Sequence, residues 1–536
     1  MGEYSTVGKR TPKSDAVPMA TGKAKFAADI TLEGMLYGKV LYSPYAHARI
    51  LSIDTSKARR LRGVKAIMTG KDTPRKPYEI GWGPPPEVKD TYILTTDKVR
   101  YTGDALAAIA AVDLDTAEEA LDLIEVDYEI LQVVNNLEEA LRPGTIKIHD
   151  YAEQNTIRTV TDGYGDVDKG FKESDYIRED VFKFPITSYM MPEPQGCIAS
   201  FDAVSGRYTF WSGFAWVYMF RSCAAILLDV PYHRIKVITY NSGGSFGGRG
   251  SWVYPSHLCA ALLSKQSGSP VKIVNSREED FAHRCATHES SVALKTGVKK
   301  DGTLVARDAT ITYDVGAYSG FEASMGTTPN ACWFHAPYRV QNLKASLSTV
   351  FTNKPPHGPF RSYGNLQPLA ACELQMEMIA KELGLDLMDI RLKNSVLPHT
   401  KTPFEWEIQS CGINECIQKA GKAINWEKQG ENLAPNRGKG IGTGMFNSVR
   451  GGTPDNPLTA TVVVNADGTA DLIAQGSDSG SGQFFAMRMI VAEELGIPVE
   501  DVKKAHVDTD ISLDRQGAVF VTISLMGRAP QIAAVD

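Results

Sequence analysis

The sequence predicts a mixed α/β (α+β) fold with more than one domain, because 536 residues exceed the usual size of a single hydrophobic core. Short runs rich in β-branched residues recur along the chain and indicate strands, and longer apolar stretches between them indicate helices. Two of these strands run into glycine-rich loops that lead directly into helices. Two Asp-Gly pairs, at residues 301–302 and 467–468, lie between alternating segments and predict β-hairpins.

The composition excludes several classes of protein. The chain carries 57 basic and 63 acidic residues, and its net charge of −6 argues against a dedicated nucleic-acid binder. Its apolar runs are shorter than the ~18 residues that a membrane span requires. The first ten residues contain charges and no apolar core, so they do not form a secretory signal. We therefore expect a cytoplasmic protein.

The eight cysteines are dispersed, and none forms a Cys-x-x-Cys pair. This dispersal is typical of buried thiols in a reducing compartment rather than of a disulfide framework. Iron–sulfur clusters and zinc sites need closely grouped ligands, so the sequence predicts neither in this chain. Because the ten histidines are equally scattered, we expect no metal ion held by side chains.

The first 134 residues alternate strands with helices and predict a unit of their own. Residues 105–112 are continuously apolar, as in a strand that is buried on both faces. Thr116 and Glu119 form a capping box, which predicts a helix over residues 117–124. A less regular connector follows at residues 135–162. Further strands are predicted at residues 36–42, 48–53, 64–68, 125–131 and 180–184.

Residues 241–250, Asn-Ser-Gly-Gly-Ser-Phe-Gly-Gly-Arg-Gly, hold five glycines and one aromatic residue, Phe246. The alternating residues 234–240 predict a strand that enters this loop, and residues 251–263 predict a helix that leaves it. Glycines permit positive φ and leave peptide N–H groups free to point at oxygen atoms of a ligand. A tight turn that needs glycine for its geometry alone is the competing interpretation.

A second glycine loop, residues 475–483, follows a predicted strand at 471–474 and leads into a helix that ends near Leu495, before Gly496. Backbone amides at such a helix start can bind an anion, most simply a phosphate. Neither loop matches the P-loop or the Gly-x-Gly-x-x-Gly pattern, so nucleoside triphosphate and Rossmann sites are weak interpretations.

Residues 353–364 form an extended proline-rich segment that contains Phe360, Arg361 and Tyr363. A helix is predicted to follow it, from Pro368 to Leu383, and its apolar stripe indicates core packing. Glu193 stands between two prolines, and a carboxylate bonded to nearby backbone is a simpler interpretation of it than a catalytic group.

Four segments together resemble the molybdenum-binding subunit of the xanthine dehydrogenase and aldehyde oxidoreductase family, in its bacterial form, which includes 4-hydroxybenzoyl-CoA reductase and nicotinate dehydrogenase. The resemblance covers essentially the whole chain. Residues 21–29 with 42–50 resemble the start of the family's a/b hammerhead domain. Residues 243–248 resemble its Gly-Gly-Gly-Phe-Gly-Gly loop, residues 360–364 its Phe-Arg-Gly-Phe-Gly segment, and residues 480–482 its Gly-Gln-Gly loop.

The resemblance implies a hammerhead domain at residues 1–134, the connector at 135–162, and a molybdopterin-binding domain whose first part is residues 163–430 and whose second part begins at 431–536. It implies a molybdenum ion ligated by a pterin dithiolene, most commonly in the cytosine dinucleotide form, which explains the lack of a protein-held metal. The implied cofactor-binding residues are Gly243, Gly244, Phe246, Gly247, Gly248, Phe360, Arg361, Gly480, Ser481, Gly482, Gln483 and Val519, and the implied substrate pocket is lined by Phe214, Phe246 and Tyr363.

The sequence departs from the family at several places. Phe214, in Trp211-Ser-Gly-Phe-Ala-Trp216, stands where many members have a glutamine near the metal, and it cannot donate a hydrogen bond. Gly250 replaces the acidic residue of purine-specific members, and Thr328 aligns near their arginine. We therefore expect an apolar or aromatic-rich pocket rather than purine oxidation.

The family's general-base glutamate lies in a C-terminal segment that these 536 residues do not match, so no catalytic residue is assigned here. The interpretation that we prefer is a split subunit, with an incomplete molybdopterin-binding domain that a second chain completes. The expected function is an oxidoreductase subunit that hydroxylates with water, or reduces, an aromatic, heteroaromatic or aldehyde carbon. Electrons would pass to 2Fe-2S and FAD on partner subunits. The alternative is a catalytically degenerate paralogue that acts as a scaffold or cofactor-insertion platform.

Overall fold

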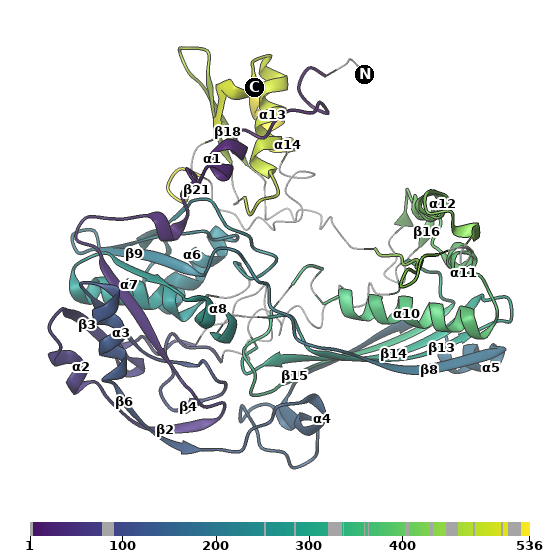
Figure 1. The fold of residues 1–536 in the computed structure, drawn as a ribbon, viewed down its shortest axis with the longest axis horizontal. Helices are drawn as coiled ribbons and strands as arrows, with labels where there is room; N and C mark the ends of the chain where they lie inside the picture. The colour runs from purple at the N-terminus through teal and green to yellow at the C-terminus, as the bar shows by residue number, and fades with distance from the viewer. Residues whose placement is uncertain are drawn as a thin grey trace.

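The computed structural model of this chain describes residues 4–77, 90–250, 253–283, 286–319, 335, 337–358, 360–362, 364–401, 407–428, 433–445, 459–474, 478–504, 507–512 and 527–535. Two large sheets dominate the molecule, and a smaller sheet with two helices stands above them at the C-terminal end (Figure 1). Within these residues, no helix combines the length and the apolar character that crossing a membrane would need.

The larger sheet has eight strands and joins residues from distant parts of the sequence. Its most enclosed strand, β5 (Ala105–Ala111), is buried along its whole length, which accounts for its continuous apolar sequence. The parallel pairing of β1 with β12 connects the first unit of the chain to the later strands. In order across the sheet, the strands are β21 (Val507–Asp508), β11 (Ile235–Thr239), β10 (Arg207–Ser212), β9 (Gly196–Asp202), β12 (Val271–Val274), β1 (Leu36–Tyr42), β5 and β3 (Val64–Thr69).

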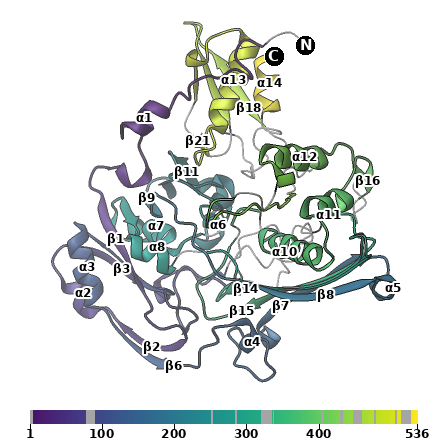
Figure 2. The same ribbon diagram turned by 45° about the vertical axis from the view of Figure 1, so that its right-hand side comes forward.

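The second sheet has five strands and is covered by helices on one face. Figures 1 and 2 show α10 (Leu366–Glu382) lying along this face, with α11 (Leu387–Asn394) beside it. Strand β8 (Tyr176–Phe184) alternates half-buried and exposed residues, as expected of a strand with one face toward helices and one toward water. The strand order is β7 (Thr156–Tyr164), β15 (Asn342–Phe351), β14 (Leu304–Gly316), β13 (Ser290–Val298) and β8.

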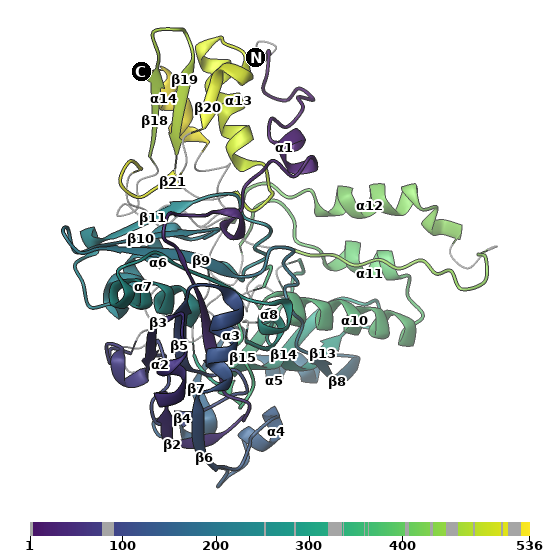
Figure 3. The ribbon, with the colours of Figure 1, turned by 60° about the vertical axis from the view of Figure 1, so that its left-hand side comes forward.

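The third sheet consists of β18 (Ala460–Val464), β19 (Ala470–Ala474) and β20 (Val502–Lys504). Helices α13 (Gln483–Leu495) and α14 (Arg528–Val535) pack beside it, and the short helix α1 (Ala16–Ala20) lies close to α13 (Figure 3). The N-terminal segment is fastened to α13, because Glu493 accepts hydrogen bonds from the backbone N–H groups of Ser5, Thr6 and Val7.

The remaining elements connect these sheets. A small sheet in the first unit contains β4 (Lys98–Val99), β2 (Ala48–Asp54) and β6 (Glu125–Ile130). The other helices and strands are α2 (Ser56–Arg60), α3 (Leu114–Asp122), α4 (Leu137–Ala140), α5 (Val167–Glu173), α6 (Val217–Leu227), α7 (Pro255–Ser267), α8 (Arg277–His283), α12 (Ile413–Ala423), β16 (Thr400–Lys401) and β17 (Glu407–Ile408).

Most of the predicted elements are confirmed, and the differences lie at their ends. Strand β8 begins at Tyr176, four residues before the predicted start at residue 180. The predicted start of α3 is wrong: the carboxylate of Asp113 accepts from the N–H of Thr116, so Asp113 caps the helix and Thr116 lies inside it. Helix α7 begins at Pro255, later than predicted, because proline is favoured in the first turn. Both Asp-Gly hairpins are confirmed, between β13 and β14 and between β18 and β19.

Candidate functional site

The first glycine loop leaves β11, the strand next to the β21 edge of the larger sheet, and runs toward α7. Three residues in it have positive φ: Gly244 at 96°, Phe246 at 51° and Gly247 at 119°. Positive φ is uncommon for a residue with a large side chain, so the surrounding structure must impose it on Phe246. The ring of Phe246 is 37% exposed, and the loop therefore presents an aromatic group outward from a constrained backbone.

Glu193 lies against this loop and forms a buried ion pair with Arg249, a residue of the loop, at 2.9 Å between Nη2 and Oε2. Gly243 donates its N–H to Glu193 Oε2 at 2.7 Å, and Glu193 returns a backbone hydrogen bond to the carbonyl of Gly243. Arg249 donates from Nε to the carbonyl of Gly244 at 2.7 Å. The prediction that the Glu193 carboxylate is bonded to nearby backbone is confirmed.

The glycines at both ends of the loop permit a close approach of neighbouring groups. A Cβ on Gly243 would lie 2.4 Å from the Cβ of Glu193, inside any real carbon–carbon contact. A Cβ on Gly248 would lie 2.7 Å from the ring of Tyr189. The loop is thus pressed against the segment between β8 and β9, and a larger residue at either position would displace it.

The second predicted segment meets the first loop directly. The backbone N–H of Arg361 donates to the carbonyl of Phe246 at 3.2 Å, and the Arg361 guanidinium carbon lies 5.4 Å from the centroid of the Phe246 ring. Phe360 stacks on Tyr189 with ring centroids 5.3 Å apart. The structure therefore brings Gly243–Gly248 and Phe360–Arg361 together, although more than 100 residues separate them in the sequence.

The end of β14 supports the Phe360–Arg361 segment from below. The Tyr313 hydroxyl donates to the carbonyl of Gly364 at 2.7 Å, and the backbone N–H of His357 donates to the carbonyl of Val315 at 2.9 Å. Ser362, between these two anchors, has a φ of 64°. The segment is therefore held at both ends while its middle turns toward Phe246. No local pattern in the sequence pointed to Tyr313, because it lies on a strand far from the loop.

The third predicted segment has a different set of contacts. Gly480 and Gly482 have φ of 105° and 76°, and both donate their N–H groups to Asp478 Oδ1, at 2.9 and 3.1 Å. A Cβ on Gly482 would lie 3.6 Å from Cε of Lys13, in the N-terminal segment. Gln483 begins α13 and is buried. These contacts place the loop against Asp478 and Lys13, and its predicted role in binding a cofactor stays a prediction.

Phe214 lies in the largest hydrophobic core rather than on an open surface, with 4% of its area exposed. Its ring stacks on Phe220 at a centroid distance of 3.8 Å and meets the His257 ring edge-on at 5.0 Å. Its predicted place in the substrate pocket stays a prediction. Tyr363 and Val519, together with Thr328, lie outside the described residues.

His257 is a buried polar group beneath the glycine loop that was not recognised in the sequence. Burial and then the charge of Arg249 lower its pKa to about 3, so the imidazole is neutral. Among the described residues, neither of its ring nitrogens has a hydrogen-bond partner. The aromatic rings of Phe214, Phe220 and Tyr254 surround it instead.

The residues at the junction fit a large polar cofactor. Among the described residues, Ser362 Oγ and Asn365 Oδ1 are buried without a hydrogen-bond partner. Buried polar atoms are normally satisfied, and atoms left over beside Arg361 suit a polar ligand. Arg361 itself is exposed and offers guanidinium donors next to them. No cluster of histidine, cysteine or carboxylate side chains suitable for a metal ion occurs in the described part of the chain.

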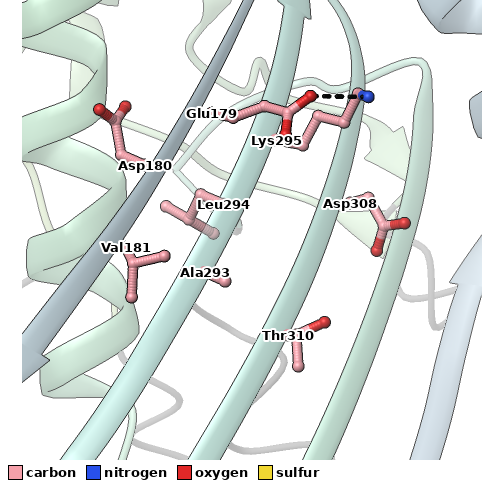
Figure 4. Close-up of a pocket in the computed structure, with 8 residues that line it drawn as sticks. All are labelled: Glu179, Asp180, Val181, Ala293, Leu294, Lys295, Asp308 and Thr310. Atoms are coloured by element: carbon pink, nitrogen blue, oxygen red, sulfur yellow. Dashed lines mark ion pairs between the residues drawn. The ribbon is translucent and has the colours of Figure 1, made fainter.

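A separate trough of about 330 Å³ lies on the uncovered face of the five-stranded sheet (Figure 4). Its polar rim includes the ion pair of Lys295 with Glu179, at 2.8 Å, and the carboxylate of Asp308. Val181 and Ala293 form its apolar part. None of the predicted site residues lines this trough, so it is distinct from the junction of the two loops.

Models of known protein families match three regions of the chain. The family model for the aldehyde oxidase and xanthine dehydrogenase a/b hammerhead domain matches residues 21–132. Two models for a molybdopterin cofactor-binding domain match residues 148–395 and 418–527.

Several known proteins are similar to this chain over most of its length. The nicotinate dehydrogenase large molybdopterin subunit of Eubacterium barkeri is 34% identical over 419 residues, which cover 78% of this chain and 96% of that subunit. A probable xanthine dehydrogenase subunit of Bacillus subtilis is 33% identical over 505 residues, 93% of this chain, and the chain spans 66% of that relative.

The fold is shared with solved oxidoreductases. Quinoline 2-oxidoreductase from Pseudomonas putida 86 superimposes with a TM-score of 0.90 at 25% identity, covering 99% of this chain and 71% of that one. The aldehyde oxidoreductase of Desulfovibrio gigas, at 24% identity and a TM-score of 0.88, has the same fold; the match covers 98% of this chain and 59% of that one.

Proposed function

The chain belongs to the xanthine dehydrogenase and aldehyde oxidoreductase family, and on that premise we propose that it is the molybdopterin-binding subunit of a multi-subunit oxidoreductase. The observation that carries the proposal is the junction at which Arg361 donates its backbone N–H to the carbonyl of Phe246. Two segments that resemble the family's cofactor loops meet there, near buried polar atoms that lack partners among the described residues. A scaffold needs no such exposed arginine and constrained aromatic residue at one place.

The molybdenum–pterin group would supply a metal that exchanges two electrons with a substrate carbon and oxygen with water. The backbone of Gly243–Gly248 would bound the cofactor on one side. Arg361 would donate hydrogen bonds to its polar atoms, and Phe246 and Tyr363 would restrict where a substrate ring can lie. For Gly480–Gln483, the proposal is main-chain contact with the more distant part of the cofactor. The cytosine dinucleotide form of the cofactor is part of the proposal.

The proposed substrate is a small molecule with an aromatic, heteroaromatic or aldehyde carbon, which the enzyme hydroxylates with water or reduces. Two similar proteins are named for nicotinate and quinoline, which are nitrogen heteroaromatics. The exposed ring of Phe246 supports a planar, partly apolar ligand, because aromatic faces pack well on one another. The same chemistry at the metal serves either direction of the reaction.

The proposed complex contains an iron–sulfur subunit and a flavin subunit. The names of several relatives describe subunits of larger complexes, which supports partner chains in general. The cytoplasm is the proposed location. If this polypeptide alone, purified without partners, contained iron–sulfur and flavin groups, the proposal of partner subunits that carry them would be wrong.

The test measures the enzymatic activity of the native complex after cells are grown with a controlled supply of molybdate or tungstate. The complex, purified from cells grown on molybdate, is assayed with a panel of aldehydes and nitrogen heteroaromatics and an artificial electron acceptor. Growth on tungstate, which takes the place of molybdenum in the pterin, should abolish the activity. Turnover that persists unchanged after tungstate growth would contradict the proposal.

A second candidate function, a catalytically degenerate scaffold or cofactor-insertion platform, is favoured by one observation. Phe214 is packed in the core against Phe220, so its side chain offers no hydrogen bond where many relatives have glutamine. A folded complex that carries the pterin but turns over none of the tested substrates would support this candidate. Turnover of any of them would exclude it.

A further inference from the structure

The glycine loop is held by a buried pair of charges that the proposed reaction does not itself require. Arg249 and Glu193 have side chains that are 1% and 8% exposed. Arg249 belongs to the loop, and Glu193 lies in the segment that precedes β9. Burying two charges is costly, and the cost is recovered only when every polar atom has good partners. This pair meets that condition through the backbone of the loop.

The guanidinium of Arg249 ties two separate backbone segments together. It donates from Nε to the carbonyl of Gly244 at 2.7 Å and from Nη2 to the carbonyl of Glu193 at 2.6 Å. The Nη2 group also contacts Glu193 Oε2 at 2.9 Å. Because the guanidinium is planar, these contacts fix both the distance and the orientation of the loop relative to Glu193.

The carboxylate of Glu193 holds the other end of the loop. Its Oε2 accepts from the N–H of Gly243 at 2.7 Å, and its Oε1 accepts from the N–H of Ala27 at 3.3 Å. The absence of a Cβ on Gly243 allows this approach. Both ends of the loop, at residues 243 and 249, are therefore bonded to one carboxylate.

The Glu193–Arg249 ion pair and its backbone hydrogen bonds together form a clamp on the loop. Its consequence appears in the residues between 243 and 249. Phe246 is held at a φ of 51° and Gly247 at 119°, and the Phe246 carbonyl is turned to accept from Arg361. A loop with five glycines would sample many conformations without such restraint. The clamp selects the loop conformation that joins Gly243–Gly248 to the Phe360–Arg361 segment.

We infer that Glu193 and Arg249 are positioning residues, whose ion pair pre-shapes the glycine loop to receive the molybdopterin cofactor; this inference rests on the proposed function. They touch neither the metal nor the substrate in this role. They act through the backbone of Gly243, Gly244 and Phe246, and their effect is to remove the cost of ordering the loop when the cofactor binds.

The first test is amide hydrogen exchange of the full-length wild-type chain produced in a host that makes no pterin. The N–H of Gly243, in a loop but bonded to Glu193, should exchange at least about tenfold more slowly than an unbonded loop amide. This measurement needs neither a variant nor the cofactor. Exchange at the rate of an open loop would overturn the inference.

The second test compares Arg249→Lys with a matched control, Arg391→Lys. Arg391 forms an ion pair with Glu373 at the same distance, 2.9 Å, with side chains 1% and 12% exposed, on helices that cover the five-stranded sheet. Lysine keeps the charge but cannot make the planar set of hydrogen bonds. Both substitutions should lower the melting temperature, because each disrupts a buried pair.

Only Arg249→Lys should also accelerate exchange of the Gly243–Gly248 amides, by about tenfold, and speed the release of pterin from the loaded complex by a similar factor. Glu193→Gln, which keeps one acceptor oxygen, should give an intermediate effect on both. Equal effects of the two lysine variants on loop exchange and pterin release would overturn the inference. If the wild-type complex held no pterin, the proposed function would fail, while the exchange measurements would still decide whether the clamp orders the loop.

Discussion

Replacing Gly243 by alanine tests how closely the glycine loop must approach Glu193. The added methyl carbon would lie 2.4 Å from Glu193 Cβ and 3.2 Å from its backbone nitrogen. Gly243 is not among the residues with positive φ, so alanine fits its backbone conformation and only the steric contact is changed. The backbone of the loop and the backbone at Glu193 must therefore move apart.

The expected loss in the free energy of unfolding of Gly243→Ala has two contributions. Forcing an extra methyl group into a packed site costs about 1–3 kcal/mol. Separating the backbones also weakens the bond from the Gly243 N–H to the Glu193 carboxylate, and hydrogen bonds to charged groups contribute about 1.5–3 kcal/mol. Because the two effects overlap, we expect a total loss of about 2–4 kcal/mol in the free energy of unfolding.

The assay is equilibrium urea unfolding followed by tryptophan fluorescence, with pterin content measured on the same preparations. Gly438→Ala is the matched control, because a Cβ there meets nothing within 4 Å and its φ lies outside the left-handed region. The control should stay within ~0.5 kcal/mol of wild type and keep its pterin. A Gly243→Ala protein with wild-type stability and pterin content would refute the reasoning.

Three further predictions concern other residues. Phe214→Gln should lower the free energy of unfolding by about 3 kcal/mol, because it loses buried aromatic contacts and buries an amide; an unchanged urea midpoint would contradict this. His257 has a folded pKa of about 3, below its ordinary value of 6.5, so it stays neutral and stability falls as pH drops from about 6.5 toward 3. His257→Phe should therefore reduce the slope of unfolding free energy against pH by up to ~1.4 kcal/mol per unit between pH 4 and 6, and an unchanged slope would exclude His257 as its source. Glu493→Gln should speed tryptic cleavage at Lys9 without changing the melting temperature, because the carboxylate that accepts the N–H groups of Ser5, Thr6 and Val7 is weakened; equal cleavage rates would count against that anchoring.

Features that depend on neighbouring residues were predictable from the sequence. The strand that enters the glycine loop and the helix Gln483–Leu495 were predicted within a residue or two, because alternation and a terminal glycine are local signals. The start of α3 was missed because two capping residues, Asp113 and Thr116, lie one turn apart, and the pattern did not decide between them.

Features that depend on distant residues were not predictable. Arg249 and Glu193 are 56 residues apart, and no spacing in the sequence indicates that they share a hydrogen-bond network. Tyr313 reaches Gly364 from another element in the same way. Phe214 meets the ring of His257, which lies 43 residues further along the chain, and its role in the substrate pocket stays a prediction. The positions of the loops could be predicted from the sequence, and the side chains that fix the shape of the loops could not.

The most direct test of the central claim is the molybdenum and pterin content of the native complex, for the wild type and for Arg361→Ala. Because Arg361 lies where the two loops meet, we expect about one molybdenum and one pterin per wild-type chain and a loss of most of both in the variant. The thermal unfolding of the two proteins without cofactor should be the same, since Arg361 is exposed. A well-folded wild-type complex that contains neither molybdenum nor pterin would contradict the account.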